Sequence, residues 1–238
     1  MWLDGLYSTT AKSASAAYLK DGMLAGQFYI NSGLTHSTTL MPMTENLLNI
    51  AGLSLDDIDF FAVSCGPGSF TGLRIGIAAV KGMALAENKP CVAVSTLEAI
   101  AYGFVKTDRL ICSLIDARCK RFFCAFFRCT ADGDVKRLTD DKALGYEEIA
   151  DIINRDYSGE NVIFAGDGAE AAYSLMKDIT DNVDVAPLHI CFQQSVGVAM
   201  AAEKYIKLGK AVGSQQLVPI YLSLPQAQRE LQKKQGNK

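Results

Sequence analysis

The fold is decided by the glycine-rich stretch Ser64-Cys65-Gly66-Pro67-Gly68-Ser69-Phe70-Thr71-Gly72-Leu73-Arg74-Ile75-Gly76. The β-branched and aromatic residues just before it, from Ile58 to Val63, predict a buried strand. Apolar residues after it recur at helical spacing, which predicts a helix from Thr71 to Glu87. A glycine loop that leaves a strand and opens a helix aims free N–H groups outward, and this is the geometry of an anion site.

The glycine spacing of this loop fits neither of the common nucleotide motifs. It is one residue longer than the dinucleotide fingerprint, and the next strand, Cys91 to Ser95, ends without the carboxylate that would hold a ribose. A P-loop is excluded because Lys81 lies far along the helix. Two interpretations stay open, a nucleotide- or anion-binding loop and a tight turn for packing. The loop residues of the first are Gly66, Gly68, Ser69, Thr71, Gly72 and Arg74.

The composition is that of a soluble globular protein. A chain of 238 residues can bury the core of one large or two small domains, and 49% hydrophobic with 21% charged residues is an ordinary balance. No apolar segment is long enough to span a bilayer, and the first residues do not resemble a secretion signal, so we expect a cytoplasmic protein. The net charge of −3 argues against the chain being the main surface that grips a nucleic acid.

The cysteines and histidines do not have the spacing of a metal site. The number of cysteines is odd, and five of them lie in apolar runs, which predicts reduced core residues: Cys65, Cys91, Cys112, Cys124 and Cys191. Cys119, Cys124 and Cys129 are too far apart in sequence for a zinc motif. The two histidines, His36 and His189, form neither a His-x-x-x-His nor a His-Glu-x-x-His pair. A metallohydrolase site therefore lacks its usual ligands.

The order of the predicted elements indicates two similar α/β units. The first unit has strands at 2–8, 13–19 and 24–30, a helix from 35 or 37 to 51, the glycine-loop strand and helix, a strand at 91–95 and a helix at 96–105. The second has a hairpin of 110–117 with 121–130, a helix at 146–155, a strand at 161–165, a helix at 169–178, a strand at 183–187 and a helix at 195–208. The first order is that of a ribonuclease H-like unit, the half-module of the actin-like ATPase fold.

We therefore predict an α/β fold with two ribonuclease H-like domains, in which mixed sheets are flanked by helices and the second domain is a degenerate copy. The predicted N-terminal domain covers residues 1–105, the smaller second domain 106–194 and a C-terminal extension 209–238. The helix at 195–208 is expected to pack back on the N-terminal domain.

Several segments beside the glycine-rich stretch share one family pattern. They are Lys12-Ser13-Ala14-Ser15, His36 through Leu40-Met41-Pro42, Ala84-Leu85-Ala86, Val94-Ser95-Thr96-Leu97, Ile115-Asp116-Ala117-Arg118 and Pro219-Ile220-Tyr221-Leu222. Together they closely resemble the TsaB (YeaZ) family of bacterial tRNA threonylcarbamoyladenosine biosynthesis, which is related to the glycoprotease/TsaD family. The segments occur in the family's order, and the match runs from about Thr9 to Leu222.

The resemblance implies a non-catalytic protein. In the family, this subunit activates its paralogue TsaD, which transfers a threonylcarbamoyl group onto the adenosine beside the anticodon, and it works with the small ATPase TsaE. The resemblance implies that this chain contacts tRNA only through the complex. It also implies that the chain requires no cofactor or metal, and it is compatible with weak nucleotide binding. Ser8 stands where the superfamily commonly has the Asp that organises a metal. Asp116 and Asp167 are interpreted as turn residues rather than catalytic groups.

Two helices beside the glycine-loop strand carry the predicted interface. Small or adaptable residues form a stripe on the second, and on the first Met41 and Leu48 lie off a core stripe that ends at Ile50. The resemblance implies that the pair meets the paralogue's equivalent helices in a four-helix bundle, and that isolated chains pair through the same face. The predicted interface residues are Leu40, Met41, Leu48, Gly72, Gly76, Ala79 and Met83. In the alternative interpretation, both stripes are buried against the chain's own sheet.

Two other functions stay open. The chain is an enzyme in the first, either a glycoprotease-like peptidase or a nucleotide-binding kinase of the actin-like fold. Ser69, Ser95 and Cys65 are its conceivable nucleophiles, yet no His or Asp has a sequence context that assigns it to any of them. In the second, the chain is a self-dimerising regulatory module.

Overall fold

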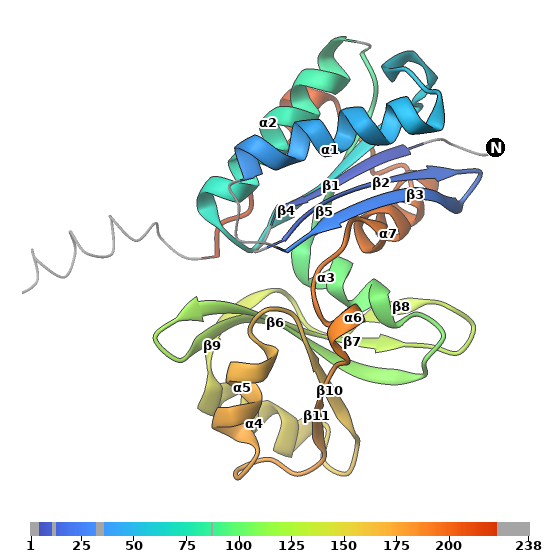
Figure 1. The fold of residues 1–238 in the computed structure, drawn as a ribbon. Coiled ribbons are helices and arrows are strands. Elements are labelled where there is room, and N and C mark those ends of the chain that lie inside the picture. Colours follow the sequence, from blue (N-terminus) through green and yellow to red (C-terminus); the bar gives the residue numbers. More distant parts are fainter. Residues whose placement is uncertain (1–4, 11–12, 32–35, 87, 223–238) are drawn as a thin grey trace, which may run out of the picture.

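The computed structural model describes residues 5–10, 13–31, 36–86 and 88–222. It contains two mixed sheets with helices on their faces, stacked one above the other (Figure 1). We call each sheet with its helices a unit. Residues 2–4 of the first predicted strand lie outside the described residues.

The first sheet has the strand order β3-β2-β1-β4-β5. Its strands are β1 (Gly5–Thr10), β2 (Ala14–Lys20), β3 (Met23–Ile30), β4 (Phe60–Gly66) and β5 (Cys91–Ser95). β1, β2 and β3 form an antiparallel meander, whereas β4 and β5 run parallel to β1. Every residue of β4 is buried, as expected for a strand with helices on both faces of its sheet.

Two pairs of helices cover this sheet (Figure 1). α1 (His36–Ala51) and α2 (Phe70–Ala86) lie on one face, and α3 (Thr96–Ala101) and α7 (Ser195–Lys207) lie on the other. α7 contacts β1, β2, β4 and β5, although it lies near the other end of the chain. It crosses α3 so closely that a Cβ atom at Gly197 would clash with the carbonyl oxygen of Ala99. This crossing therefore requires glycine.

The second sheet repeats the order of the first. Its strands are β6 (Arg109–Arg118), β7 (Arg121–Cys129), β8 (Val135–Arg137), β9 (Lys142–Gly145), β10 (Val162–Ala165) and β11 (Val183–Val185). Their order is β11-β10-β6-β7-β8, with β9 paired to β7. Starting from β8, this is the order of the first sheet with the same parallel and antiparallel neighbours. The predicted fold of two ribonuclease H-like units is confirmed.

Helices of the second unit lie mainly on the face turned away from the first sheet (Figure 1). These are α4 (Tyr146–Asp156) and α5 (Ala169–Met176), while the short α6 (Leu188–Cys191) precedes α7. In the part of the chain that the structure describes, three single turns of 3₁₀ helix occur, at Leu55–Asp57, Tyr102–Phe104 and Ser214–Gln216. Within the described ranges, none of the helices combines the length and the apolar character that a membrane span needs.

The core consists of two clusters of buried side chains. One packs α1 and α2 on the first sheet and includes Met43, Phe61 and Val80. The other runs from Val94 on the opposite face of that sheet through α3 and α7 to Phe126 in the second sheet. Because the second cluster is continuous between the two sheets, the units share part of their core.

Two residues of α1 differ from the predicted stripes. Ile50, predicted to lie on the core stripe, is 78% exposed because it belongs to the last turn of the helix, next to the Gly52 turn that ends it. Leu48, predicted to lie off that stripe, is buried in the core. α1 packs on β2, β3 and α2 at once, so its buried arc is wider than one stripe.

Candidate functional site

The glycine loop joins β4 to α2, as predicted. Gly66 at the end of β4 has a φ of 123°, a conformation that L side chains rarely adopt. The Gly66–Pro67 peptide bond is cis. α2 begins at Phe70, and the Oγ of Ser69 accepts a hydrogen bond of 3.3 Å from the backbone N–H of Gly72. The serine thus satisfies one of the free donors at the start of the helix, in the manner of an N-cap.

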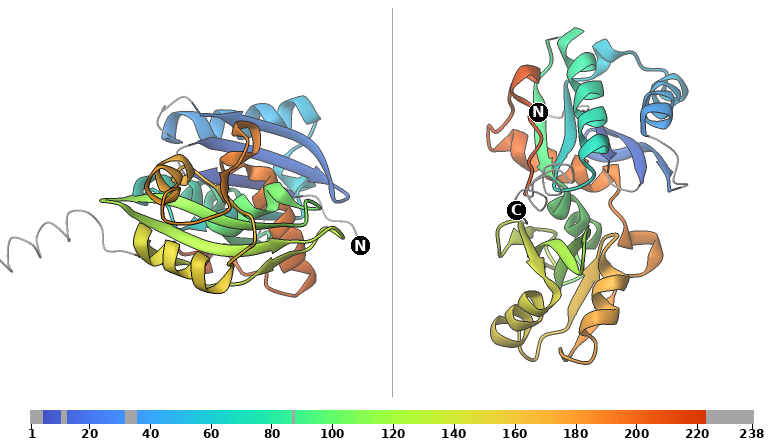
Figure 2. Two further views of the ribbon diagram at one scale, coloured as in Figure 1. Left: turned by 90° about the horizontal axis from the view of Figure 1, so that it is seen from below. Right: turned by 90° about the vertical axis from the view of Figure 1, so that its left-hand side faces the viewer.

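A segment near the end of the described chain lies against this loop. We call residues 212–221 the strap. At its start, Val212 and Cys91 exchange two backbone hydrogen bonds of 2.8 Å, and at its end the N–H of Ile220 donates to the carbonyl oxygen of Cys65 at 2.7 Å. Figure 2 shows the strap, in orange-red, along the side of the first sheet. The strap therefore follows the edge of the sheet from β5 to the end of β4.

Side chains fix the strap to α2. Leu217 is only 1% exposed and belongs to the core cluster under α1 and α2. The ring of Tyr221 stacks on that of Phe70 with 4.5 Å between centroids, and the guanidinium of Arg74 lies 4.1 Å from the centroid of Phe70. The Nε of Arg74 also donates to the hydroxyl of Tyr221 at 3.0 Å. The first turn of α2 and the end of the strap form one packed cluster.

The strap occupies space that the predicted anion loop would offer. A Cβ atom at Gly66 would clash with the carbonyl oxygen of Ile220, so the glycine is needed to admit the chain's own backbone. Ser69 caps its own helix, and Arg74 is bound to Tyr221. Gly68 and Thr71 lie at the same loop–helix junction, where Gly68 is partly exposed and Thr71 is exposed. Anion or nucleotide binding by these residues stays a prediction.

Most of the predicted interface residues are buried within the chain. These are Leu40, Leu48, Gly72, Gly76 and Met83. α2 packs against α1, β1 and β4, which accounts for the burial of its small-residue stripe. Met41 is 45% exposed, and Ala79 is partly exposed. Partner binding through this helix pair stays a prediction, and Met41 is its most accessible predicted residue.

Asp116 and Asp167 have turn roles. The backbone N–H of Asp116 donates to Oδ1 of Asp167 at 3.1 Å, and Oδ1 of Asp116 accepts the N–H of Arg118 at 2.7 Å. The first bond joins the end of β6 to the turn after β10, and the second closes a local turn at the end of β6. Ser8 lies in β1 opposite Val63 of β4, and α1 begins at His36.

The conceivable nucleophiles have structural partners or are buried. The Oγ of Ser95 donates to Oδ2 of Asp141 at 2.7 Å and accepts the N–H of Glu98 at 3.3 Å, which caps α3. Burial raises the pKa of the Cys65 thiol to about 12. A thiol with so high a pKa carries almost no thiolate at neutral pH. The predicted core cysteines are free and buried.

A group of charged residues joins the two units, and sequence reasoning missed it. Glu98 on α3 is buried, and its Oε2 accepts hydrogen bonds from Nη2 of Arg137 at 3.0 Å and from the hydroxyl of Tyr205 at 2.7 Å. Arg137 also pairs with Asp141 and stacks over Phe127. Burial, with the bond to Glu98 second, raises the pKa of Tyr205 well above its usual range. Glu98 therefore links α3, the second sheet and α7.

The fold and the site together define a ribonuclease H-like α/β protein whose glycine loop is held by its own strap. The chain belongs to the family described as tRNA N6-adenosine threonylcarbamoyltransferase (TsaD), whose model matches residues 32–235. Among the described residues, no group of three or more His, Cys, Asp or Glu is placed to hold a metal ion.

Curated relatives carry the name tRNA threonylcarbamoyladenosine biosynthesis protein TsaB. The one from Escherichia coli K12 is 34% identical over 52% of this chain and 54% of its own length, and the one from Bacillus subtilis 168 is 33% identical over 46% and 48%. The chain thus matches about half the length of these relatives. A solved structure from Pseudomonas aeruginosa, described as an uncharacterized protein with similarity to peptidase YeaZ, is 25% identical with a TM-score of 0.79, over 92% of this chain and 99% of that one. The predicted resemblance to TsaB (YeaZ) proteins is confirmed.

Proposed function

We propose that this chain is the non-catalytic partner of a TsaD-type transferase in forming threonylcarbamoyladenosine in tRNA. The names of the TsaB relatives support the pathway. The observation that carries the non-catalytic role is the position of the histidines. The chain has two, and they lie apart, His36 at the start of α1 in the first unit and His189 in α6. Neither belongs to a paired ligand motif on one helix, which a His-ligated metal enzyme of this kind would use.

Exposed apolar side chains on the helix pair support a protein partner. Met41 and Ile50 of α1 and Leu85 of α2 are exposed large hydrophobic residues. Met41 and Ile50 are nine residues apart, about 180° around the helix, so each is a separate exposed apolar group and not part of one patch. Met41 is the one of these that belongs to the predicted interface. We infer that TsaD binds across α1 and α2, that the TsaE ATPase joins this assembly, and that isolated chains can pair through the same surface. The chain needs no cofactor of its own in this proposal.

Reconstitution tests the proposed function. The modified nucleoside is measured in tRNA incubated with TsaD, TsaE and a source of the threonylcarbamoyl group, with and without this chain. We expect modification to depend on the chain, and the chain alone to modify nothing. Equal modification without the chain would refute the proposal.

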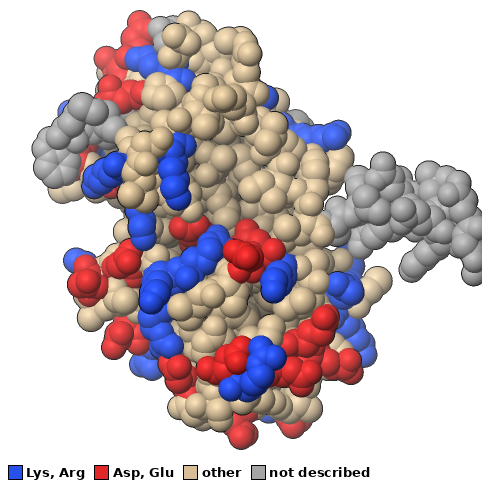
Figure 3. Space-filling view, turned by 180° about the vertical axis from the view of Figure 1, so that it is seen from behind, with Lys and Arg blue, Asp and Glu red and all other residues tan. Residues whose placement is uncertain are grey.

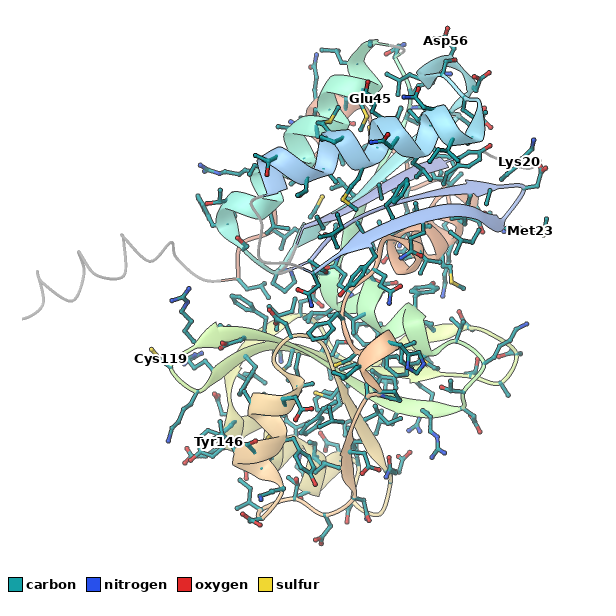
Figure 4. All side chains as sticks on the ribbon, viewed as in Figure 1. Lys20, Met23, Glu45, Asp56, Cys119 and Tyr146 are labelled. Carbon is teal, nitrogen blue, oxygen red and sulfur yellow. The ribbon has the colours of Figure 1, made fainter. Side chains whose placement is uncertain are left out.

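The interface has its own test. Met41→Glu places a charge on the outer surface of α1 and is expected to reduce co-purification with TsaD at least tenfold. Met23→Glu is the matched control, because Met23 is 72% exposed and lies at the tip of the β2–β3 hairpin, away from α2 (Figure 4). If both variants bind TsaD like the wild type, the α1–α2 surface is not the interface.

A further inference from the structure

Most sheet edges of this chain are short or covered. Among the described strands, the second sheet has β8, β9 and β11 at its edges, and these have three or four residues each. The β5 edge of the first sheet is bridged by the strap through Val212 and Cys91. β3, at the opposite edge, has eight residues and pairs only with β2 among the strands that the structure describes (Figure 1). One long edge is therefore open to a further strand.

The open edge of β3 lacks the charges that usually protect such edges. Its sequence, Met23-Leu24-Ala25-Gly26-Gln27-Phe28-Tyr29-Ile30, contains no charged residue and no proline. Lysine and proline are the residues with which soluble proteins commonly prevent edge pairing. On the opposite side of the molecule, by contrast, side chains of both charges lie interspersed over the second unit (Figure 3). The large apolar side chains at the two ends of β3 are between 37% and 72% exposed, and they are Met23, Leu24, Tyr29 and Ile30.

A β-bulge determines which side chains of β3 share a face. Tyr18 of β2 lies opposite Gly26, and the next residue, Leu19, lies opposite Leu24, so Ala25 is the additional residue. Tyr18 belongs to the core under α1, and Leu19 to the core under α3 and α7. Opposite residues share a face, and side chains alternate along a strand. The residues on the α1 face are therefore Met23, Gly26, Phe28 and Ile30, and those on the α7 face are Leu24, Gln27 and Tyr29.

This pattern of faces makes β3 complementary to a second copy of itself. Two antiparallel copies can be placed with Gln27 opposite Gln27 of the second copy, on a two-fold axis. When the bulge residue Ala25 is left unpaired, every pair in this register has both side chains on one face. The pairs are Gly26 with Phe28, Leu24 with Tyr29, and Met23 with Ile30. Each exposed apolar side chain of the strand thus gains an apolar partner.

We propose that β3 is an interface between two copies of this chain, which pair antiparallel around Gln27. The charges favour a second copy, because chains with a net charge of −3 repel one another in general, whereas β3 brings no like charges together. The pairing joins two sheets of five strands into one of ten. It uses backbone groups of β3 that β2 does not reach. It does not involve the outer surface of α1 and α2, so it goes beyond the proposed function and does not depend on it.

Sedimentation velocity of the full chain tests this pairing. The measurements use Met41→Glu as the parent chain, so that pairing through the α1–α2 surface does not contribute. We expect a monomer–dimer equilibrium over about 1–500 µM, since one pair of strands is a small interface. Leu24→Lys places an ammonium group at both ends of the paired edge and is expected to raise the dimer Kd at least tenfold. Circular dichroism checks that the variants are folded.

Ile179→Lys is the matched control for this substitution. Ile179 is 47% exposed, against 49% for Leu24, and lies after α5 in the second unit. Its dimer Kd is expected to stay within twofold of the parent chain. Equal Kd values for the two lysine variants would overturn the proposal. A monomer at every concentration would overturn it too, and would leave a strand of another protein as the occupant of the edge.

A cysteine on the two-fold axis tests the register. Directly opposite Cα atoms of antiparallel strands lie about 4.5–5.5 Å apart, which a disulfide can bridge. Cys119→Ser first removes the exposed native thiol. In that background, Gln27→Cys is expected to give a disulfide-linked dimer under mild oxidation, and Ile179→Cys is expected to stay monomeric. Equal yields of linked dimer from the two variants would overturn the proposal, because they would show random collision.

Discussion

The backbone N–H of Ile220 donates to the carbonyl oxygen of Cys65 at 2.7 Å, which ties the strap to the end of the buried strand β4. The pair of bonds between Val212 and Cys91 ties the other end to β5. The strap thus continues the sheet past its β5 edge and fixes the point where α2 begins. Substitutions in the strap and in the glycine loop should therefore have related effects on stability.

Gly66→Ala is expected to lower the free energy of unfolding by about 2 kcal/mol. The residue has a positive φ, and the added methyl group meets the carbonyl oxygen of Ile220. Gly82→Ala is the control, since Gly82 lies in α2 with open space around it and should gain about 0.5–1 kcal/mol. Urea unfolding followed by circular dichroism measures both. Similar midpoints for the two variants would contradict the described position of the strap.

Neighbouring residues of the strap should differ sharply in their effect. Leu217 is 1% exposed, and Leu217→Ala is expected to cost about 2–5 kcal/mol of unfolding free energy through lost burial and a cavity. Val218 is 60% exposed, so Val218→Ala should change stability by less than about 0.5 kcal/mol. Thermal and urea unfolding decide the comparison. A small effect of both would mean that the strap does not pack on the core in solution.

Loss of Glu98 should be costly because it is a buried acceptor shared by two elements. Glu98→Ala leaves the partly buried Arg137 with Asp141 as its remaining ion-pair partner and Tyr205 without its hydrogen bond to Glu98, for an expected loss of about 3 kcal/mol. Glu160→Ala breaks the more exposed pair with Arg128 and should cost less than about 1 kcal/mol. Urea unfolding of both variants measures the difference. Equal losses would argue against a structural role for the charged group between the units.

Thiol labelling should distinguish one cysteine from the other six. Cys119 is exposed at the tip of the β6–β7 hairpin (Figure 4), and the remaining cysteines are buried. At pH 8, a thiol reagent is expected to react rapidly with one group per folded chain and with seven after unfolding. Cys119→Ser should abolish the rapid phase. Rapid reaction of two or more thiols in the folded protein would contradict the described core.

The protein should lose stability in alkaline solution. Burial raises the pKa of Cys65 and Cys124 to about 12 and that of Cys91 to about 11, above the ordinary value of 9.0. Between pH 9 and 12, the unfolded chain therefore releases protons that the folded chain keeps. The contribution of these groups is fully present below pH 9 and is lost as the pH rises through their folded pKa values.

Urea midpoints at pH 8, 9.5 and 10.5 measure this loss. Cys119→Ser removes an exposed thiol and should leave the slope of the urea midpoint against pH unchanged. Cys91→Ala removes a buried thiol and should make that slope less steep. A urea midpoint that rises from pH 8 to pH 10.5 would contradict the prediction, because buried thiols lower the stability as the pH rises.

The longer helices and strands could be predicted because apolar residues recur in them with the period of a helix or form the apolar runs of a buried strand. The apolar runs around Phe61 and Phe126 identify strands without long-range information, and the glycine loop marks the junction of β4 and α2. β8, β9 and α6 were missed because three or four residues are too few to show a period. The exposure of Ile50 also escaped prediction, since it depends on where the helix ends relative to its neighbours.

The site was only partly predictable for a related reason. The sequence around Gly66 indicates a tight backbone position but does not tell which group approaches it. That group, the carbonyl of Ile220, lies in an irregular segment without periodicity. The contact of Glu98 with Arg137 and Tyr205 likewise joins three distant segments, and no local pattern carries it.

The position of α7 has a consequence for synthesis on the ribosome. The face of the first sheet that α7 covers is complete only after residues 195–207 have left the exit tunnel. The strands of the first unit are synthesised before those of the second. The apolar face that α7 covers nevertheless stays exposed until α7 has been synthesised, so the first unit is not complete before the second. The first unit should thus reach its final structure only after all strands of the second have been synthesised.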